Sequence, residues 1–183
     1  MKKNSINQVV ATGVGAALFV ILGMLVNIPL PIPNTSIQLQ YALQALLAVL
    51  YGPVVGFLVG FIGHALKDAI QYGSPWWSWV IVSGAFGLIL GLFSKTFKVA
   101  AGIFSKADLL KFNLYQILAN FIGWSLIAPS LDVLLYSEPA NKVYVQGIFS
   151  AIANALVVGI GGSLLLSLYA KTRPQEGSLK TDE

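Results

Sequence analysis

The fold is decided by residues 4–66, NSINQVVATGVGAALFVILGMLVNIPLPIPNTSIQLQYALQALLAVLYGPVVGFLVGFIGHAL, which contain no Asp, Glu, Lys or Arg. Three further runs without charge cover residues 69–94, 112–131 and 143–170. Hydrophobic residues make up 56% of the 183-residue chain and charged residues only 10%, whereas a soluble domain carries about 25% charged residues. The sequence therefore predicts an all-α membrane protein, because apolar runs of this length cross a bilayer as helices.

Prolines and glycines divide these runs into six predicted transmembrane helices in a single bundle. The Pro-rich segment 29–34 cannot continue a helix, because proline removes backbone donors. The predicted helices cover residues 9–28, 38–51, 54–72, 76–93, 112–129 and 144–169. We expect residues 94–111 to be a polar connection with room for a surface helix, and residues 132–142 to be a polar outer loop. Residues 1–172 then form one membrane domain, and residues 173–183 a flexible cytoplasmic tail.

Basic residues lie almost entirely on one side of this arrangement. Nine of the 11 Lys and Arg residues fall at the N-terminus, in the 94–111 connection or in the C-terminal tail. Only Lys67 and Lys142 fall on the other side. Because cytoplasmic loops carry the excess of Lys and Arg, both termini are predicted to be cytoplasmic and the Pro-rich segment to lie at the outer face. This topology accounts for the net charge of +4 without a nucleic-acid partner.

The sequence lacks the motifs of the common catalytic and metal sites. It has no Cys and a single His, which excludes a His/Cys metal cluster and thiolate chemistry. It contains no G-x-x-x-x-G-K-[ST] phosphate loop, no H-E-x-x-H and no G-x-S-x-G. We therefore predict no catalytic residue, no metal and no cofactor, and any dependence on ATP must come from a partner.

Polar and aromatic side chains instead recur at helical spacing, so that they share inward faces. His64, Asp68 and Gln71 form one such face, with Lys67 beside it. Two further faces consist of Asn113, Gln116, Asn120 and Trp124, and of Gln146, Ser150 and Asn154. The predicted ligand-binding residues are Asn34, Gln38, Tyr41, His64, Lys67, Asp68, Trp76, Trp79, Asn120, Trp124 and Asn154.

Each of these residues has a plainer interpretation. Polar side chains in membrane helices also cross-link helices without any ligand, at about 0.6 to 2 kcal/mol per bond. Asn34 and Gln38 are then hydrated loop residues, and the tryptophans at 76, 77 and 79 belong to the aromatic belt of the membrane interface. Because three tryptophans within four residues point around most of a helix, we expect Trp76 or Trp79 to face inward.

Small residues form a second pattern, which allows helix backbones to approach closely. Glycines at 52, 56 and 60 and at 84, 87 and 91 are expected to pack the third and fourth helices within the bundle. The first helix has a broader small face towards its cytoplasmic half, for which we predict contact with a partner protein. That face consists of Ala11, Gly13, Gly15 and Ala17.

Three strings carry a resemblance to a known family: PNTSIQLQY at 33–41, GFIGHALKD at 60–68 and WWSW at 76–79. With the six short helices, they resemble the substrate-binding S component of energy-coupling factor (ECF) transporters, in a subfamily grouped with riboflavin or thiamine-precursor uptake. The resemblance covers nearly the whole chain. It implies a multi-pass protein of the bacterial plasma membrane that captures a vitamin beneath the outer loop, among helices 4 to 6.

The resemblance also implies partners. The first helix would contact a transmembrane coupling (T) subunit that carries two ATP-binding subunits. The family's usual Ala-x-x-x-Ala motif is absent from this helix, where Ala11/Gly15 or Gly13/Ala17 would take its place. The chain would thus be a transporter subunit and not an enzyme.

The amide and indole groups favour a flat, neutral heteroaromatic ligand, with hydroxymethylpyrimidine or a pyridoxine-like ring ahead of riboflavin. Two other functions stay open. One is a stand-alone secondary transporter coupled to ions through His64, Asp68 or Asp132, although residues 1–90 and 91–183 show no internal repeat. The other is a structural membrane protein without a ligand, in which polar residues would be scattered rather than convergent.

Overall fold

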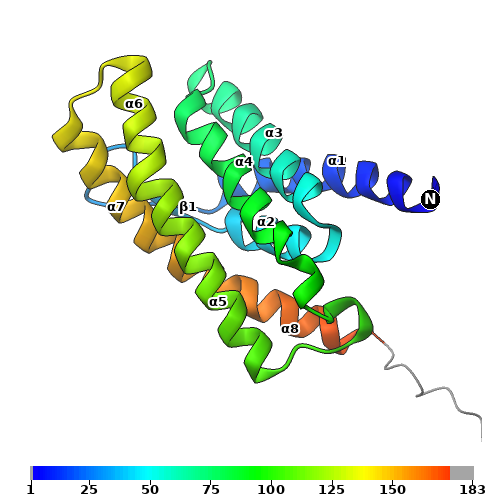
Figure 1. The fold of residues 1–183 in the computed structure, drawn as a ribbon. Helices are drawn as coiled ribbons and strands as arrows, with labels where there is room; N and C mark the ends of the chain where they lie inside the picture. The colour runs from blue at the N-terminus through cyan, green and yellow to red at the C-terminus, as the bar shows by residue number, and fades with distance from the viewer. Residues whose placement is uncertain (1, 174–183) are drawn as a thin grey trace, which may run out of the picture.

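The computed structural model describes residues 2–173, which form a bundle of helices with one short β-hairpin (Figure 1). The helices are α1 Lys2–Leu25, α2 Gln40–Tyr51, α3 Pro53–Tyr72, α4 Trp77–Leu92, α5 Lys106–Asn120, α6 Ala128–Tyr136, α7 Ala140–Val157 and α8 Ser163–Lys171. The strands are β1 Asn27–Pro29 and β2 Ser36–Gln38. Two 3₁₀ turns, η1 Ser94–Thr96 and η2 Val99–Ala101, and two π-helical segments, η3 Phe121–Ile127 and η4 Val158–Gly162, complete the elements.

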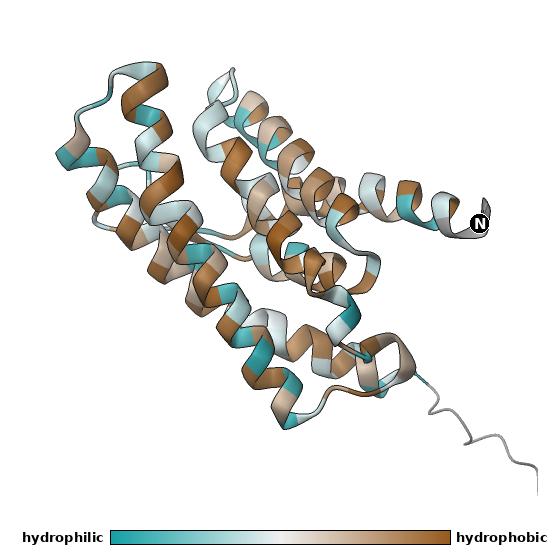
Figure 2. Cartoon of the chain, viewed as in Figure 1, coloured by the Kyte–Doolittle hydropathy of each residue, from teal (hydrophilic) through white to brown (hydrophobic). Residues whose placement is uncertain are grey.

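Five helical stretches of the described chain are long and apolar enough to cross a membrane, which agrees with the predicted class. They are Ser5–Leu25, Pro53–Tyr72, Trp77–Thr96, Lys106–Tyr136 and Ala140–Lys171. The remaining predicted span, α2, has 12 residues, fewer than the about 20 that a full crossing needs. Figure 2 shows hydrophobic residues along the length of each long helix, as contact with lipid requires.

The last two spans differ from the sequence-based expectation. Residues 132–142 were expected to form an outer loop, but α5, η3 and α6 make one stretch that continues through Pro129 to Tyr136. Pro129 is tolerated because it stands in the first turn of α6, directly after the π-helical η3, where a missing N–H disturbs little. Asp132 consequently lies inside a helix, and the next span begins at Ala140 rather than at Tyr144.

The Pro-rich segment is non-helical, as predicted, but it forms a hairpin that the sequence analysis did not foresee. β1 and β2 pair antiparallel, with Asn27 opposite Gln38 and Pro29 opposite Ser36. Asn34 turns the hairpin in a left-handed conformation (φ 56°), which Asn tolerates better than most residues. The hairpin leads into α2 and also contacts α7.

The tightest packing lies between α3 and α4, where the predicted glycine stripes meet. A Cβ atom on Gly56 would collide with the carbonyl group of Gly87, and a Cβ atom on Gly87 with that of Gly56. α1 packs across α3 and α2, and its N-terminal half projects beyond the other helices (Figure 1). α7 lies along η3 and α6, so that the two long C-terminal stretches form the other side of the bundle.

Gly87→Ala is expected to lower the free energy of unfolding by about 1 to 3 kcal/mol, because the added methyl group meets backbone rather than a movable side chain. Gly13→Ala is the matched control, since nothing lies within 4 Å of its Cβ position. Thermal unfolding of the purified variants in detergent would measure both. Equal stability of the two variants would contradict the close α3–α4 approach.

Candidate functional site

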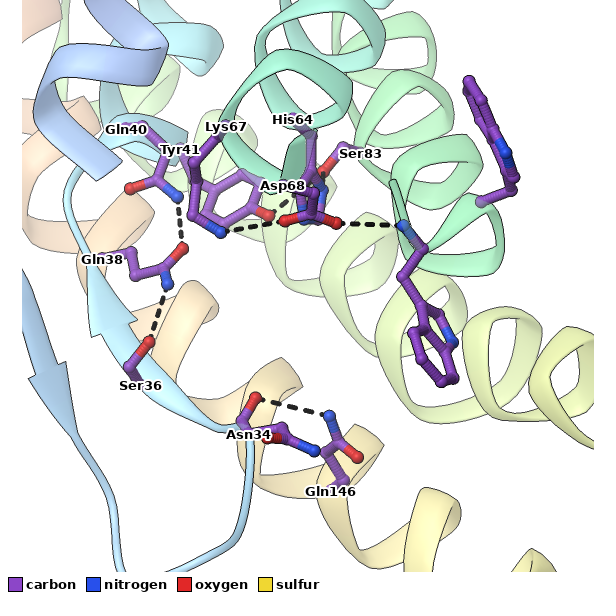
Figure 3. A network of polar contacts seen from close by, with 12 residues as sticks. Asn34, Ser36, Gln38, Gln40, Tyr41, His64, Lys67, Asp68, Ser83 and Gln146 are labelled. Atoms are coloured by element: carbon purple, nitrogen blue, oxygen red, sulfur yellow. Dashed lines mark hydrogen bonds and ion pairs between the residues drawn. The ribbon is translucent and has the colours of Figure 1, made fainter. Parts of the chain in front are cut away.

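A buried polar network joins α2, α3 and α4 beside the hairpin (Figure 3). Ser83 Oγ lies 2.6 Å from His64 Nδ1 and 3.1 Å from the hydroxyl oxygen of Tyr41. The other ring nitrogen, His64 Nε2, is 3.4 Å from Asp68 Oδ1, and Lys67 Nζ is 3.2 Å from the same oxygen. All five side chains are buried. Lys67 is thus neutralised by an adjacent carboxylate, as a charge within a membrane helix requires.

The network extends to the α3–α4 turn, and a separate chain of hydrogen bonds joins the start of α2 to the hairpin (Figure 3). The backbone N–H of Trp76 donates to Asp68 Oδ2 at 3.2 Å. On the hairpin side, the Gln40 amide donates to Gln38, whose own amide donates to Ser36 Oγ at 2.7 Å. The side-chain oxygen of Gln40 is buried and has no hydrogen-bond partner among residues 2–173.

A second cluster surrounds Asp132 of α6, which is 2% exposed. Its Oδ1 atom accepts hydrogen bonds from Trp76 Nε1 at 2.7 Å and from Ser78 Oγ. Its Oδ2 atom accepts one from Trp79 Nε1 at 2.7 Å. Every donor comes from the N-cap and first turn of α4, so this one carboxyl group ties α6 to the start of α4.

A third cluster follows α5, where the predicted polar face forms a continuous chain of hydrogen bonds. Trp124 Nε1 donates to Asn120 Oδ1 at 3.0 Å, and Asn120 Nδ2 donates to Gln116 Oε1 at 2.9 Å. Gln116 donates in turn to Asn113 Oδ1 at 3.2 Å and to the backbone carbonyl of Ala155 on α7 at 3.1 Å. The π-helical η3 carries Trp124, and such a segment shifts the side chains beyond it relative to a regular α-helix.

An aromatic centre links the three clusters. Trp79 stacks on Trp124 with ring centroids 5.7 Å apart, and Tyr41 meets Trp124 edge-on at 5.3 Å. Tyr41 also contacts Phe86 and Phe19 edge-on. The arrangement offers π faces surrounded by amide, hydroxyl, imidazole and carboxyl groups, which is the composition of a pocket for a flat polar ligand.

The structure brings most of the predicted ligand-binding residues together around this centre. They are Tyr41, His64, Lys67, Asp68, Trp76, Trp79, Asn120 and Trp124. Gln38 instead bonds to Gln40 and Ser36 at the hairpin. Asn34 lies apart on the exposed turn of the hairpin, where its carbonyl accepts a hydrogen bond from Gln146 at 3.4 Å (Figure 3). Asn154 is buried on α7 beside Ala155, and its side chain forms no hydrogen bond with any described residue. Gln71 is exposed, because α3 ends one residue later.

Sequence reasoning missed Asp132, Ser78 and Ser83 as site residues. Asp132 was considered only for ion coupling in an expected loop, yet it stands eight residues after Trp124, on the continuation of the polar face of α5. Ser83 stands four residues after Trp79. Extending the face of Trp79 by one turn would have found Ser83, whereas Asp132 lies beyond Pro129, where the sequence predicted the end of the helix.

The small face of α1 divides into two parts. Gly15 is buried, and a Cβ atom there would lie 2.5 Å from Leu47 Cδ1 and 2.8 Å from a methyl group of Val59, so this position packs inside the bundle. Ala11 is partly buried against the core. Gly13 and Ala17 are exposed. Only 28% of the most apolar 18-residue stretch of this span is buried inside the protein, the lowest share among the five spans.

Two open grooves lie away from the aromatic centre. One, of about 450 Å³, runs between α5 and α7 and is lined mainly by apolar side chains, with Asn113 and Gln116 at its edge. The other, of about 300 Å³, lies between α1 and α2 and includes Ala11 and Gly15. Neither groove is lined by Tyr41, Trp79 or Trp124.

The long apolar helices and the polar centre among them define a multi-pass membrane protein with a buried candidate ligand site. The family described as "ECF-type riboflavin transporter, S component" matches residues 3–171, and the chain belongs to this family. It is therefore a membrane component of vitamin uptake rather than an enzyme, which confirms the resemblance noted in the sequence.

Curated relatives cover the chain almost completely. A UPF0397 protein of Streptococcus agalactiae is 62% identical over 182 residues, which is 100% of both chains. UPF0397 protein YdcD of Lactococcus lactis subsp. lactis is 59% identical over 179 residues, 98% of each chain. A UPF0397 protein of Streptococcus gordonii is 58% identical over 178 residues, 97% of this chain and 95% of the relative.

Proposed function

We propose that this chain is the substrate-capture subunit of an ATP-driven ECF importer. It binds a small heteroaromatic vitamin or vitamin precursor from outside, of hydroxymethylpyrimidine or pyridoxine size or as large as riboflavin, and delivers it inward. The observation that carries the proposal is the aromatic centre of Tyr41, Trp79 and Trp124, enclosed by hydrogen-bonding groups from five helices. Membership of the riboflavin-transporter S-component family supports it, since riboflavin is a heteroaromatic vitamin.

The centre suits such a ligand for two reasons. Indole faces stack on flat rings, and neighbouring donors and acceptors then select the ring substituents. Two buried side-chain oxygens lack a partner within the described chain, namely those of Gln40 and Gln44 on α2, and the side chain of Asn154 forms no hydrogen bond with any described residue. Because an unpaired buried polar group costs about 1 to 3 kcal/mol, a ligand that pairs with it gains affinity and selectivity.

Thermal unfolding with a panel of vitamins and precursors tests this proposal. A ligand present at about 100 times its dissociation constant adds roughly 2.7 kcal/mol of stability, which is a clear shift of the unfolding midpoint. The panel would contain hydroxymethylpyrimidine, pyridoxine, pyridoxamine, thiamine and riboflavin. If none of them stabilises the purified chain, the proposed capture of a heteroaromatic vitamin is wrong.

We further propose that both termini face the cytoplasm, from the distribution of Lys and Arg. Cysteines introduced at Asn34 and Asn141, both exposed in the structure, should react with an impermeant thiol reagent in intact cells. A cysteine at Lys106, at the start of α5, should react only after permeabilisation. The chain contains no natural Cys, so each signal reports a single site. The reverse pattern would place the hairpin in the cytoplasm.

Residues 174–183 of the predicted tail lie outside the described residues, and they include Lys180, one of the basic residues on which the topology depends.

The proposed partners are a transmembrane T subunit and two ATP-binding subunits. The absence of a phosphate loop from the sequence requires the ATPases to be separate chains. The exposed part of the α1 small face, Gly13 and Ala17, is the proposed contact with the T subunit, because a backbone without bulky side chains allows a second helix to approach closely.

A further inference from the structure

Asp132 is a buried acidic group that forms no ion pair with a basic residue in the part of the chain that the structure describes. The other buried charges form a compensated set, since Lys67 pairs with Asp68 at 3.2 Å. Asp132 forms no ion pair with any residue in the described part of the chain. Its two oxygens accept from two indole N–H groups and one hydroxyl group, which is the pattern of a carboxylate, because a carboxylate only accepts hydrogen bonds.

Hydrogen bonds solvate this carboxylate but do not neutralise it. The N-terminus of α4, from which all three donors come, contributes a partial positive charge at most. Hydrogen bonds between neutral groups would be enough to hold α4 against α6. Burying an isolated charge in a membrane protein, in contrast, costs free energy. A charge in this position is therefore best explained if something outside the chain supplies the opposite charge.

We infer, resting on the proposed function, that the captured ligand is a heteroaromatic cation and that Asp132 receives its positive charge. The sequence alone favoured a neutral ligand because it offers amide and indole groups with little fixed charge, and Asp132 was expected in a polar outer loop. Aromatic rings surround the carboxylate as a cation requires: Trp79 donates to it, and Trp76 donates to it while packing on Tyr136 at 4.8 Å.

The geometry also provides a route for exchange. Trp76 is 42% exposed, so it is the donor that a ligand reaches first from the outer face. Asp132 Oδ1 accepts from both Trp76 and Ser78. A ligand ammonium or ring N–H group can therefore replace the Trp76 donor while Ser78 keeps its bond and Trp79 still holds Oδ2.

A matched pair of probes tests the inference on the purified full chain. Pyridoxamine carries a protonated aminomethyl group at neutral pH, and pyridoxine carries a hydroxymethyl group on the same ring. Thiamine, a permanent cation, and neutral riboflavin form a second comparison. Calorimetry on the unmodified chain should show tighter binding of pyridoxamine than of pyridoxine, or of thiamine than of riboflavin, by at least about tenfold.

Asp132→Asn should weaken binding of the cationic probe by about 30-fold or more and leave neutral probes within about twofold, because it removes one partner of a buried charge pair. Glu138→Gln is the matched control, since it removes the same charge from the α6–α7 connection six residues away and should change neither affinity. The probe pairs on the unmodified chain keep the test decisive if Asp132→Asn does not fold.

The outcomes separate the two proposals. The inference is overturned if neutral probes bind as tightly as cationic ones, or if the Asp132→Asn variant binds the cationic probe with unchanged affinity. Either result leaves the proposed capture of a vitamin standing. Failure of every probe to bind overturns both. An equal loss in Glu138→Gln would mean that the outer surface attracts cations generally, which also overturns a specific role for Asp132.

Discussion

Replacing Gly13 by Leu is expected to abolish ATP-driven uptake while leaving ligand binding by the isolated chain intact. Gly13 is exposed on α1, and nothing lies within 4 Å of its Cβ position, so the free chain accommodates the larger side chain. A partner helix packed against this small face would be forced away, because close backbone approach needs small residues. Reconstitution with the coupling subunits would show reduced complex recovery and at least about tenfold slower uptake.

Val14→Leu is the matched control for this prediction. Val14 is the next residue of α1, is 55% exposed and is already bulky, so the change adds little volume outside the small face. Uptake by this variant should stay near that of the unmodified chain. The proposal fails if Gly13→Leu transports normally, or if the chain alone in liposomes accumulates ligand under an ion gradient.

Helical periodicity predicted the hydrogen-bonded cluster along α5 but could not show where its helix ends. The spacing of Asn113, Gln116, Asn120 and Trp124 is a property of one helix, and the structure joins these side chains by hydrogen bonds. The end of that helix was misjudged because Pro129 normally interrupts hydrogen bonding. A preceding π-helical segment is a local distortion without a composition signal, so the inclusion of Asp132 in the site was not predictable from pattern alone.

Long-range pairings account for most of the remaining difference. Lys67 lies off the predicted face of His64 and Asp68, but its long flexible side chain turns back to Asp68 and is buried. The partners of Asp132 are more than 50 residues away in the sequence, and spacing within one helix says nothing about such contacts. The strands of the hairpin have three residues each, too few for an alternating pattern to appear.

The three-dimensional contacts also separate two amides that the sequence treated alike. Asn120 is fully engaged within the chain, since it donates to Gln116 and accepts from the buried Trp124 indole. Asn154 forms no side-chain hydrogen bond with any described residue although it is only 5% exposed. The first therefore holds the aromatic centre in place, and we propose that the second contacts the ligand.

Asn154→Ala is accordingly expected to weaken ligand binding by roughly 5- to 150-fold with little change in thermal stability, because it leaves a polar group of the bound ligand unpaired at about 1 to 3 kcal/mol. Asn120→Ala should weaken binding in the same range, but it should also lower the stability of the free chain, since Trp124 Nε1 loses its acceptor within the bundle.

Trp79→Phe should retain part of the stacking surface that Trp79→Ala removes. Gln146→Ala is the control, because that side chain contacts only the exposed hairpin turn. Calorimetry with whichever probe the vitamin panel identifies, together with thermal unfolding without ligand, measures both effects. Unchanged dissociation constants in both Asn variants would mean that these amides only hold helices together, and that the ligand binds elsewhere in the bundle.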